Sequence, residues 1–537
     1  MGGVAPTHEV LNQVPPFRPT DLLQTDPGLQ AGLRQHGNKR VLRSLAGLGI
    51  LTGSPEAEEW GEQANTCPPT LRTHDRYGHR IDEVNFHPAW HRLMQTSVED
   101  GLHAAPWASG SQHAHLRRAA GFFLMSQVEA GHGCPISMTY AIWPALQQNP
   151  ELAAAYGPGL TATTYAPGLA DPLTKPGLLA GMAMTEKQGG SDVRANTTRA
   201  VEQPDGSFRL TGHKWFCSAP MCDLFLVLAQ VEGAGLSCFL VPRVLPGGER
   251  NVFALQRLKD KLGNRSNASA EVEFDQTVGW LVGPEGKGVR TIIDMVTMTR
   301  LDCVIGSAAG QRAAYAFARH HAEHRAVFGA KLIDQPVMRP VLADLAVESE
   351  AATATFLRLA AAVDAGEQPF ARIAVAVAKF WICKRSAPVV GEALECLGGN
   401  GYVEESGLPR LFRESPLNSI WEGSGNVIAL DVLRALARDE AATAALRTEL
   451  AAARGTDARY DAMLVSLERR LSTTPEPTDA RRLAGELALL LQASLLLRTA
   501  PGVIADVFCA TRLGPQPSGL LGSGLTRQQA DAVLAVR

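Results

Sequence analysis

The stretch Phe208-Arg209-Leu210-Thr211-Gly212-His213-Lys214-Trp215-Phe216-Cys217-Ser218 follows the turn Asp205-Gly206-Ser207 and predicts a β-strand. Further strand-like runs lie on both sides of it, at Gly181–Thr185, Leu224–Val231, Leu236–Val241 and Ala268–Phe274. Turn residues separate these runs, and no helix-length periodicity interrupts them. The sequence therefore predicts one β domain, a barrel or a sandwich, over residues 181–288.

Helical patterns surround this β domain. Upstream, residues 1–180 combine a Pro- and Gly-rich arm with helical segments such as Ala119–Ala130. Downstream, residues 289–438 predict a helix bundle made of Thr291–His324, Pro336–Ala365, Phe370–Gly398 and Val427–Arg438. Residues 439–537 predict an additional C-terminal helical domain. The order of helices, strands and helices predicts an α+β fold whose β domain is not part of a βαβ series.

Composition limits the functional classes. The chain has 537 residues, 45% apolar and 20% charged, which is typical of a soluble globular protein of several domains. Its net charge of −3 provides no general attraction to nucleic acid or to an anionic membrane. The nine cysteines form no CxxC pair, so reduced thiols and no metal site are expected. No signal peptide is apparent and the run Leu487–Leu497 is too short to span a bilayer, so we expect a cytoplasmic protein without membrane contact.

A candidate catalytic carboxylate lies in the loop Asn418-Ser419-Ile420-Trp421-Glu422-Gly423-Ser424-Gly425-Asn426, directly before an apolar helical run. Its glycines allow another molecule to approach the backbone closely, and the loop can direct Glu422 into a cavity. The alternative is that Ser424 or Asn426 caps the helix while Glu422 is a solvated acid. The loop by itself leaves both interpretations open.

Two stretches of the β domain have the composition of a ligand-binding wall. Residues 184–192, Met-Thr-Glu-Lys-Gln-Gly-Gly-Ser-Asp, carry hydroxyls and glycines that could wrap a polar cofactor, although a plain surface loop is the alternative. This loop is not GxGxxG, so a Rossmann dinucleotide site is not supported. Trp215, three residues before Ser218, could place its ring beside a flat cofactor or could belong to the core.

Helix ends provide the remaining candidates. Arg325 and Phe328 end a predicted helix before a glycine, either as an ordinary helix end or as a phosphate contact. Residues 395–402 form a second glycine loop that closes a helix. Glu129 and His132 line a cavity or form a satisfied pair at a helix end.

In this order, and within a helix–β–helix architecture, these motifs resemble the acyl-CoA dehydrogenase flavoprotein family over about residues 88–438. Three segments resemble the AidB branch of that family in sequence: residues 184–192, Lys259-Asp260-Lys261-Leu262-Gly263-Asn264-Arg265-Ser266, and residues 421–426. The N-terminal arm and C-terminal helical block of that branch are similar to the two ends of this chain. The resemblance implies an acyl-CoA dehydrogenase-like fold, non-covalently bound FAD and a homotetramer.

The resemblance also implies roles for individual residues. Glu422 falls where many members keep the catalytic base. The implied FAD contacts are Met184, Thr185, Gly190, Ser191, Trp215, Ser218, Arg325, Phe328, Gln335, Gly398, Gly399, Trp421, Ser424 and Asn426. Of these, the group around Arg325 would contact largely the FAD of a neighbouring subunit.

The implied reaction oxidises an acyl-CoA thioester, with a base that takes a proton from Cα while a hydride leaves Cβ for the flavin. A carboxylate with an ordinary pKa of about 4.3 is a poor base for a carbon acid. Burial against Trp421 is therefore expected to raise the pKa of Glu422, and Glu129 is the next candidate base.

The AidB branch suggests a second function, a DNA-associated protein that protects against alkylation damage and uses flavin for structure or detoxification. Because the net charge is negative, weak, non-specific binding of double-stranded DNA would depend on local clusters of arginine. The best pairs are Arg469-Arg470 and Arg481-Arg482, which flank a proline-containing linker.

Overall fold

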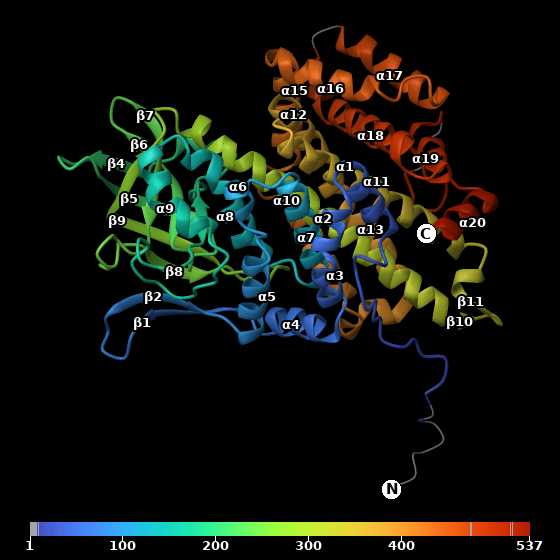
Figure 1. The fold of residues 1–537 in the computed structure, drawn as a ribbon, viewed down its shortest axis with the longest axis horizontal. Helices are drawn as coiled ribbons and strands as arrows, with labels where there is room; N and C mark the ends of the chain where they lie inside the picture. Colours follow the sequence, from blue (N-terminus) through green and yellow to red (C-terminus); the bar gives the residue numbers. More distant parts are fainter. Residues whose placement is uncertain (1–7, 9, 473–474, 516, 518) are drawn as a thin grey trace.

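The β domain lies at one end of the molecule, and helices form the rest of it (Figure 1). The computed structural model describes residues 8, 10–472, 475–515, 517 and 519–537. The helix α10 (Gly288–His324) begins beside the β domain and crosses the helical part. Its 37 residues extend about 55 Å at 1.5 Å per residue, so α10 connects the two ends of the protein. The predicted α+β architecture is confirmed.

The chain before the β domain is mostly helical. Its helices are α1 (Pro27–His36), α2 (Lys39–Ser44), α3 (Ala46–Thr52), α4 (Pro55–Thr66), α5 (Pro88–Glu99), α6 (Ala105–Ala108), α7 (Ala114–Val128), α8 (Gly133–Leu146) and α9 (Pro150–Thr161). An antiparallel hairpin, β1 (Thr70–His74) and β2 (Arg80–Asn85), was not predicted because its strands are short and polar. The helix α8 is buried along nearly its whole length, since it packs between the β domain and α10.

Seven strands form the β domain. They are β3 (Ala180–Ala183), β4 (Arg199–Glu202), β5 (Phe208–Ser218), β6 (Leu224–Val231), β7 (Gly235–Pro242), β8 (Ala254–Leu258) and β9 (Ser269–Val282). The ladder runs β6-β4-β5-β9-β7 and returns to β6, so the sheet closes into a barrel. Strand β6 is apolar and almost wholly buried, as expected for a strand covered on both faces.

The segment after the barrel forms the helix bundle. With α10, it contains α11 (Met338–Asp364), α12 (Gln368–Ala378), α13 (Lys384–Cys396), α14 (Leu408–Glu414) and α15 (Gly425–Arg438). Short elements connect these helices: β10 (Ala326–Val327), β11 (Ala330–Lys331), the π-helical turn η4 (Lys379–Cys383), and the 3₁₀ turns η3 (Leu332–Asp334), η5 (Gly398–Tyr402), η6 (Glu404–Ser406) and η7 (Leu417–Ser419). A further 3₁₀ turn, η2 (Val193–Ala195), lies in the β domain.

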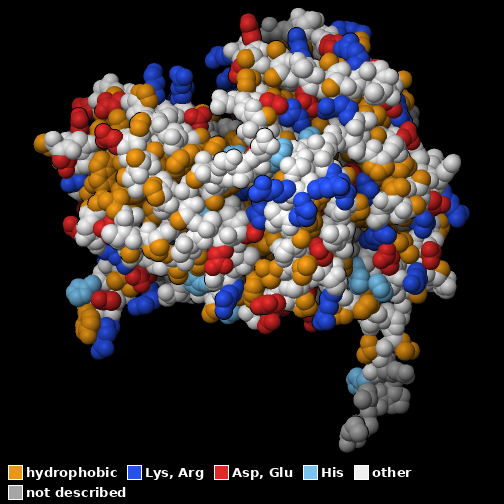
Figure 2. All heavy atoms as spheres, viewed as in Figure 1, with side chains coloured by type: hydrophobic (Ala, Val, Ile, Leu, Met, Phe, Trp, Pro, Cys, Tyr) orange, Lys and Arg blue, Asp and Glu red, His pale blue; other side chains and the backbone are white. Residues whose placement is uncertain are grey.

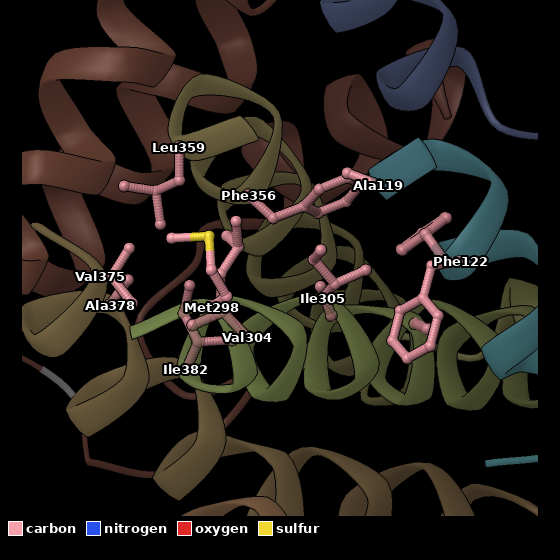
Figure 3. Close-up of a cluster of buried hydrophobic side chains, with 14 of the residues drawn as sticks. Ala119, Phe122, Met298, Val304, Ile305, Phe356, Leu359, Val375, Ala378 and Ile382 are labelled. Atoms are coloured by element: carbon pink, nitrogen blue, oxygen red, sulfur yellow. The ribbon is translucent and has the colours of Figure 1, made fainter. Parts of the chain in front are cut away.

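The centre of the bundle is an apolar cluster. Figure 3 shows Met298 and Ile305 of α10 beside Phe356 of α11 and Ala378 of α12, and all four are buried. Burying one large apolar side chain stabilises a fold by about 1.5–3 kcal/mol. Met298 and Ala378 directly precede two polar residues of the candidate site, so this packing also fixes the backbone from which those residues extend.

The C-terminal block packs on the bundle. It comprises α16 (Glu440–Ala451), α17 (Ala458–Leu471), η8 (Pro477–Asp479), α18 (Ala480–Thr499), α19 (Gly502–Phe508), the π-helical turn η9 (Cys509–Leu513) and α20 (Arg527–Val536). The apolar run of α18 is buried against α11, α15 and α17. Across the residues that the structure describes, no helix combines the length and the apolar character needed to cross a membrane.

Candidate active site

Glu422 lies in a tight loop between η7 and α15, and its backbone is left-handed, with φ 57°. A non-glycine residue rarely adopts this conformation and keeps it only when its surroundings hold it there. The next residue, Gly423, also has a positive φ of 102°. The two residues together turn the chain sharply, so the Glu422 side chain is directed inward and not along the helix surface.

The Glu422 carboxyl group is held by a residue of α10. The Thr299 hydroxyl donates a hydrogen bond to Glu422 Oε2 at 2.7 Å. Burial raises the pKa of Glu422, while the Thr299 hydrogen bond and the charges of Lys379 and Arg300 limit that rise. Glu422 is thus half-buried with its carboxyl group bound by α10, which favours the cavity interpretation over that of a freely solvated loop acid.

Two buried cations tether the loop backbone, and a buried carboxylate holds one of them. Arg300 Nε donates to the Glu422 carbonyl at 3.0 Å, and Arg300 Nη1 donates to Asp431 Oδ2 of α15 at 2.8 Å. Lys379 Nζ, 1% exposed on the π-helical turn η4, donates to the Gly423 carbonyl at 2.8 Å. Because α10, η4 and α15 each contribute one residue, the loop conformation depends on the packing of the whole bundle.

The β barrel supplies the opposite wall. The backbone N–H of Trp215 donates to the Thr185 carbonyl at 2.8 Å, so the two predicted motifs are neighbours. A Cβ on Gly190 would meet the Thr185 hydroxyl at 2.4 Å, which explains the glycine there. Met184, Thr185 and Trp215 are all half-buried, and Lys259 Nζ lies 3.5 Å from the centroid of a Trp215 ring.

A buried ion pair fixes this wall. Lys214 Nζ donates to Glu186 Oε1 at 2.8 Å, and the backbone N–H of Thr197 donates to Glu186 Oε2 at 2.6 Å. Burial alone would raise the pKa of Glu186, but Lys214 and the hydrogen bonds from residues 197 and 198 lower it to about 2. Glu186 is therefore an ionised anchor of the 184–192 loop.

The two walls meet at Cys134, near the start of α8. Burial raises the pKa of the Cys134 thiol to about 12, and the nearby Glu422 carboxylate contributes to the rise. The side chains of Ser218 and Asn267 lie beside the same thiol. The Asn267 side chain is 1% exposed, and apart from this contact with the Cys134 thiol its amide has no hydrogen-bond partner among the described residues. Its remaining hydrogen-bonding capacity is available to a polar ligand.

The carboxylate of Glu129, the alternative base, already accepts several hydrogen bonds within the protein. Its carboxylate accepts from Ser266 Oγ at 2.6 Å and from the backbone N–H groups of Gly131 and His132, both at 2.8 Å. Burial would raise its pKa, but His132 and Ser266 lower it to about 2. The interpretation of Glu129 and His132 as a satisfied pair at a helix end is therefore the correct one.

A second group of predicted cofactor residues lies away from Glu422, at the far end of α10. Arg325 donates to the Asn12 carbonyl of the N-terminal arm, and Gln335 Nε2 donates to the Val327 carbonyl at 2.9 Å. Phe328, at the tip of the β10–β11 hairpin, is 99% exposed. The other members, Gly398 and Gly399, follow α13 and are also exposed. This group remains a prediction.

The start of α15 holds the last predicted cofactor residues. Ser424 occupies the N-cap position, but its side chain makes no capping hydrogen bond. Asn426 Oδ1 accepts from Arg481 Nη1 of α18 at 2.7 Å. Trp421 Nε1 donates to Asn418 Oδ1 at 2.8 Å, which anchors the ring before the Glu422 turn.

A cavity of about 450 Å³ opens between the β domain and α15. Its lining is Ser191, Asp192, Val193, Arg194, Val289, Arg434 and Arg438. Ser191 and Asp192 belong to the predicted 184–192 loop, and the sequence analysis did not single out the other lining residues as site residues. Three guanidinium groups at one opening, with a single aspartate, form a region suited to anionic groups.

The arginine pairs predicted for DNA are largely engaged by the protein itself. Arg470 pairs with Glu486 at 2.6 Å, and Arg482 pairs with Asp479 at 2.7 Å. Arg481 contacts Asn426 of the catalytic region. The ion pairs of Arg470 and Arg482 reduce the charge that this edge could offer to DNA phosphates, whereas the partner of Arg481 is a neutral amide.

Several residues of this site were absent from the sequence prediction. Thr299, Arg300, Lys379 and Asp431 lie inside predicted helices, where no local signal distinguishes them from other helical residues. Asn267 lies one residue beyond the motif at residues 259–266, so that motif could have indicated it.

Comparison with known proteins agrees with this geometry. The Adaptive response protein AidB N-terminal domain matches residues 12–167, the acyl-CoA dehydrogenase middle domain matches 181–277, and the acyl-CoA dehydrogenase C-terminal domain matches 286–437. AidB of Escherichia coli is 47% identical over 515 residues, which cover 94% of each chain. Acyl-CoA dehydrogenase family member 11 of Caenorhabditis elegans is 31% identical, over 82% of this chain and 73% of that protein.

A solved structure extends the comparison. Caenorhabditis elegans ACDH-11, determined in complex with C11-CoA, superposes with a TM-score of 0.85 at 26% identity and covers 100% of this chain and 97% of that one. The domain matches, the identity to AidB and the shared fold lead to one conclusion: this chain belongs to the acyl-CoA dehydrogenase family, in the branch that carries the AidB N-terminal domain.

Proposed function

We propose that this protein is an FAD-dependent oxidoreductase that dehydrogenates an acyl-CoA-like substrate, with Glu422 as its catalytic base. The observation that carries the proposal is the Glu422 carboxyl group: Thr299 binds it, burial raises its pKa, and the buried Arg300 and Lys379 hold its loop. Its charge acts on the Cys134 thiol of α8, beside which Ser218 and Asn267 of the β domain lie. A general base is most effective when its pKa approaches the working pH.

The residues present fit FAD. The buried amide of Asn267, whose one contact is with the Cys134 thiol, has hydrogen-bonding capacity left, and the Thr185–Gly190 loop exposes hydroxyl and backbone groups beside the half-buried ring of Trp215. Membership of a flavoprotein family points to the same cofactor. When bound, FAD supplies the hydride acceptor that this reaction needs.

The chain's own contribution to the reaction is proton transfer and positioning. The Glu422 carboxylate takes the proton from the substrate Cα, and Thr299 orients that carboxylate through its hydrogen bond. Hydrogen bonds from the site to the thioester oxygen would stabilise the enolate charge that develops. Arg300 and Lys379 hold the loop backbone, so the base does not have to be ordered during the reaction.

The arginine-lined cavity supports a CoA thioester as substrate. Arg434 and Arg438 lie on α15, the helix that begins three residues after Glu422, and Arg194 faces them from the β domain. A thioester beside Glu422 would extend its pantetheine arm toward this opening, where the guanidinium groups would bind phosphates. The related ACDH-11 was solved with C11-CoA.

A second copy of the chain is part of this proposal. Phe328 is almost fully exposed at the hairpin tip and Tyr402 is exposed on η5, which a partner subunit would cover. We propose a homotetramer in which this surface contacts the FAD of a neighbour.

Purified protein is expected to be yellow and to release FAD in a 1:1 ratio to chains on denaturation. Adding acyl-CoAs of increasing chain length should bleach the flavin absorbance for those that the site accepts. The visible spectrum before and after each addition measures both properties. A colourless protein that gains no flavin absorbance on refolding with FAD would exclude the proposed function.

The rate of flavin reduction should fall as pH is lowered through the raised pKa of Glu422, because only the ionised carboxylate accepts a proton. Removing the Thr299 hydrogen bond, which lowers that pKa, should move the acidic limb to higher pH in Thr299→Val. Stopped-flow reduction across a pH series measures the limb, with Thr297→Val as a helix control because that hydroxyl bonds only its own helix. Coincident limbs for wild type and Thr299→Val would show that Glu422 does not set the profile.

Weak binding of duplex DNA is the second candidate function. It is favoured by Lys39, Arg40 and Arg43 of α2, which are exposed and form no ion pair among the described residues. Figure 2 shows Lys and Arg side chains gathered near the centre of one face, in the region of α2. Non-specific binding of this kind has dissociation constants of about 10⁻⁴–10⁻⁶ M and weakens with salt.

We expect that changing Lys39, Arg40 and Arg43 to Gln removes more DNA binding than changing Arg469, Arg470, Arg481 and Arg482 to Ala. The reason is that Arg470, Arg481 and Arg482 already have partners within the protein. Titration of labelled duplex at several salt concentrations compares the two variants. Affinity that does not change with salt would contradict an electrostatic origin.

A further inference from the structure

We propose that the C-terminal block completes the cofactor site, with Arg481 of α18 and Lys384 of α13 binding a phosphate group of FAD at the start of α15. This inference rests on the proposed binding of FAD. It assigns a role to a part of the chain that lies outside the matched acyl-CoA dehydrogenase domains, which end at residue 437.

Two cations converge on the first turn of α15. A Cβ on Gly425 would lie 2.9 Å from Lys384 Nζ and 3.8 Å from Arg481 Nη1. Both side chains also lie against Phe380, each 5.8 Å from the ring centroid. Arg481 is fixed further by its 2.7 Å hydrogen bond to Asn426 Oδ1. The backbone of Gly425 is therefore the point that the ammonium and guanidinium groups share.

The charge at this point is not compensated. Within the described parts of the chain, neither Lys384 nor Arg481 forms an ion pair with a carboxylate, and Lys379 adds a third cation nearby. Burial, Arg481 and Lys379 all lower the pKa of Lys384, which indicates that these cations repel one another. The uncapped start of α15 adds the positive end of a helix dipole. Such a group of positive charges is stabilised by an anion.

The position of these cations at the start of α15 indicates which anion they bind. The flavin ring must lie within reach of Glu422, three residues before Gly425, and its phosphates follow through the short ribityl chain. In the proposed function the CoA phosphates bind at Arg434 and Arg438, which lie about 14 and 20 Å farther along α15 at 1.5 Å per residue. The start of the helix is thus suited to the cofactor phosphate, and its end to the substrate phosphates.

Titration of FAD into apo-protein, followed by flavin fluorescence, tests this assignment. Arg481→Gln and Lys384→Gln should each weaken FAD binding about 10- to 100-fold, the range for one hydrogen bond to a charged group. Arg482→Gln is the matched control, because the neighbouring Arg482 is exposed and pairs with Asp479. Riboflavin has the same ring without phosphate, so its affinity should not change in either variant.

Equal FAD affinity in Arg481→Gln and Arg482→Gln would overturn the assignment while leaving the proposed function intact. Equal weakening of FAD and riboflavin would also overturn it, because the variant would then act by distorting the catalytic loop. Wild-type protein that binds no FAD would overturn both this inference and the proposed function.

Discussion

Glu422→Gln is expected to slow flavin reduction by acyl-CoA by at least about 10²–10⁴-fold, the usual contribution of a positioned acid or base. Glutamine has the size and shape of glutamate, and its side chain can still contact the Thr299 hydroxyl. It cannot accept the Cα proton. FAD content should be unchanged, because the loop is held by Arg300 and Lys379 through its backbone carbonyls and not through this carboxylate. Single-turnover reduction under anaerobic conditions measures the loss directly.

Glu129→Gln is the control for a second buried carboxylate. The Glu129 carboxylate accepts hydrogen bonds from Ser266 and from two backbone N–H groups, so it is not available as a base. We expect this variant to be less stable but to reduce its flavin at a rate near that of wild type. Flavin reduction as fast in Glu422→Gln as in wild type would show that Glu422 is not the base.

The sequence predicted best those elements whose pattern is local. Strands β5 and β6 begin and end at the predicted residues, because a turn bounds each run. Strand β8 was missed, since it has five residues and exposes polar and charged side chains. The segment Phe370–Gly398 was predicted as one helix, but the π-helical turn η4 divides it. Helical periodicity contains no signal for such a turn, which frequently marks a functional site.

Some residues of the candidate site could be predicted from local sequence, and others could not. Glu422, Trp215 and the 184–192 loop were found because glycines, aromatic residues and hydroxyl groups are concentrated in short stretches. Arg300 and Asp431 are far apart in sequence and are ordinary helical residues until packing brings them together at 2.8 Å. Their importance results from the tertiary structure alone. The same is true of Arg481, which we had considered only as a surface charge.

Replacing Asp431 is expected to have the largest effect on stability among the site residues. Its carboxylate accepts from Arg300 Nη1 and from Arg372 Nη2, both at 2.8 Å, and it is buried in α15. Asp431→Ala would leave the buried Arg300 without its carboxylate. Removing one partner of a buried ion pair typically costs about 3–5 kcal/mol of unfolding free energy. The same change should loosen the catalytic loop, since Arg300 also holds the Glu422 carbonyl.

Arg434→Ala provides the matched control, because Arg434 lies 3.7 Å from the same carboxylate but is 60% exposed. An exposed pair of this kind contributes about 0–1 kcal/mol.

Burial alone would raise the pKa of Asp431, but Arg372 and Arg300 lower it, so the folded carboxyl group has a lower pKa than the unfolded one. The stabilisation is therefore present at neutral pH and is lost as pH falls through the folded pKa. Urea denaturation of both variants at neutral and acidic pH measures this difference, and equal midpoints for Asp431→Ala and Arg434→Ala at neutral pH would contradict a structural role for the buried pair.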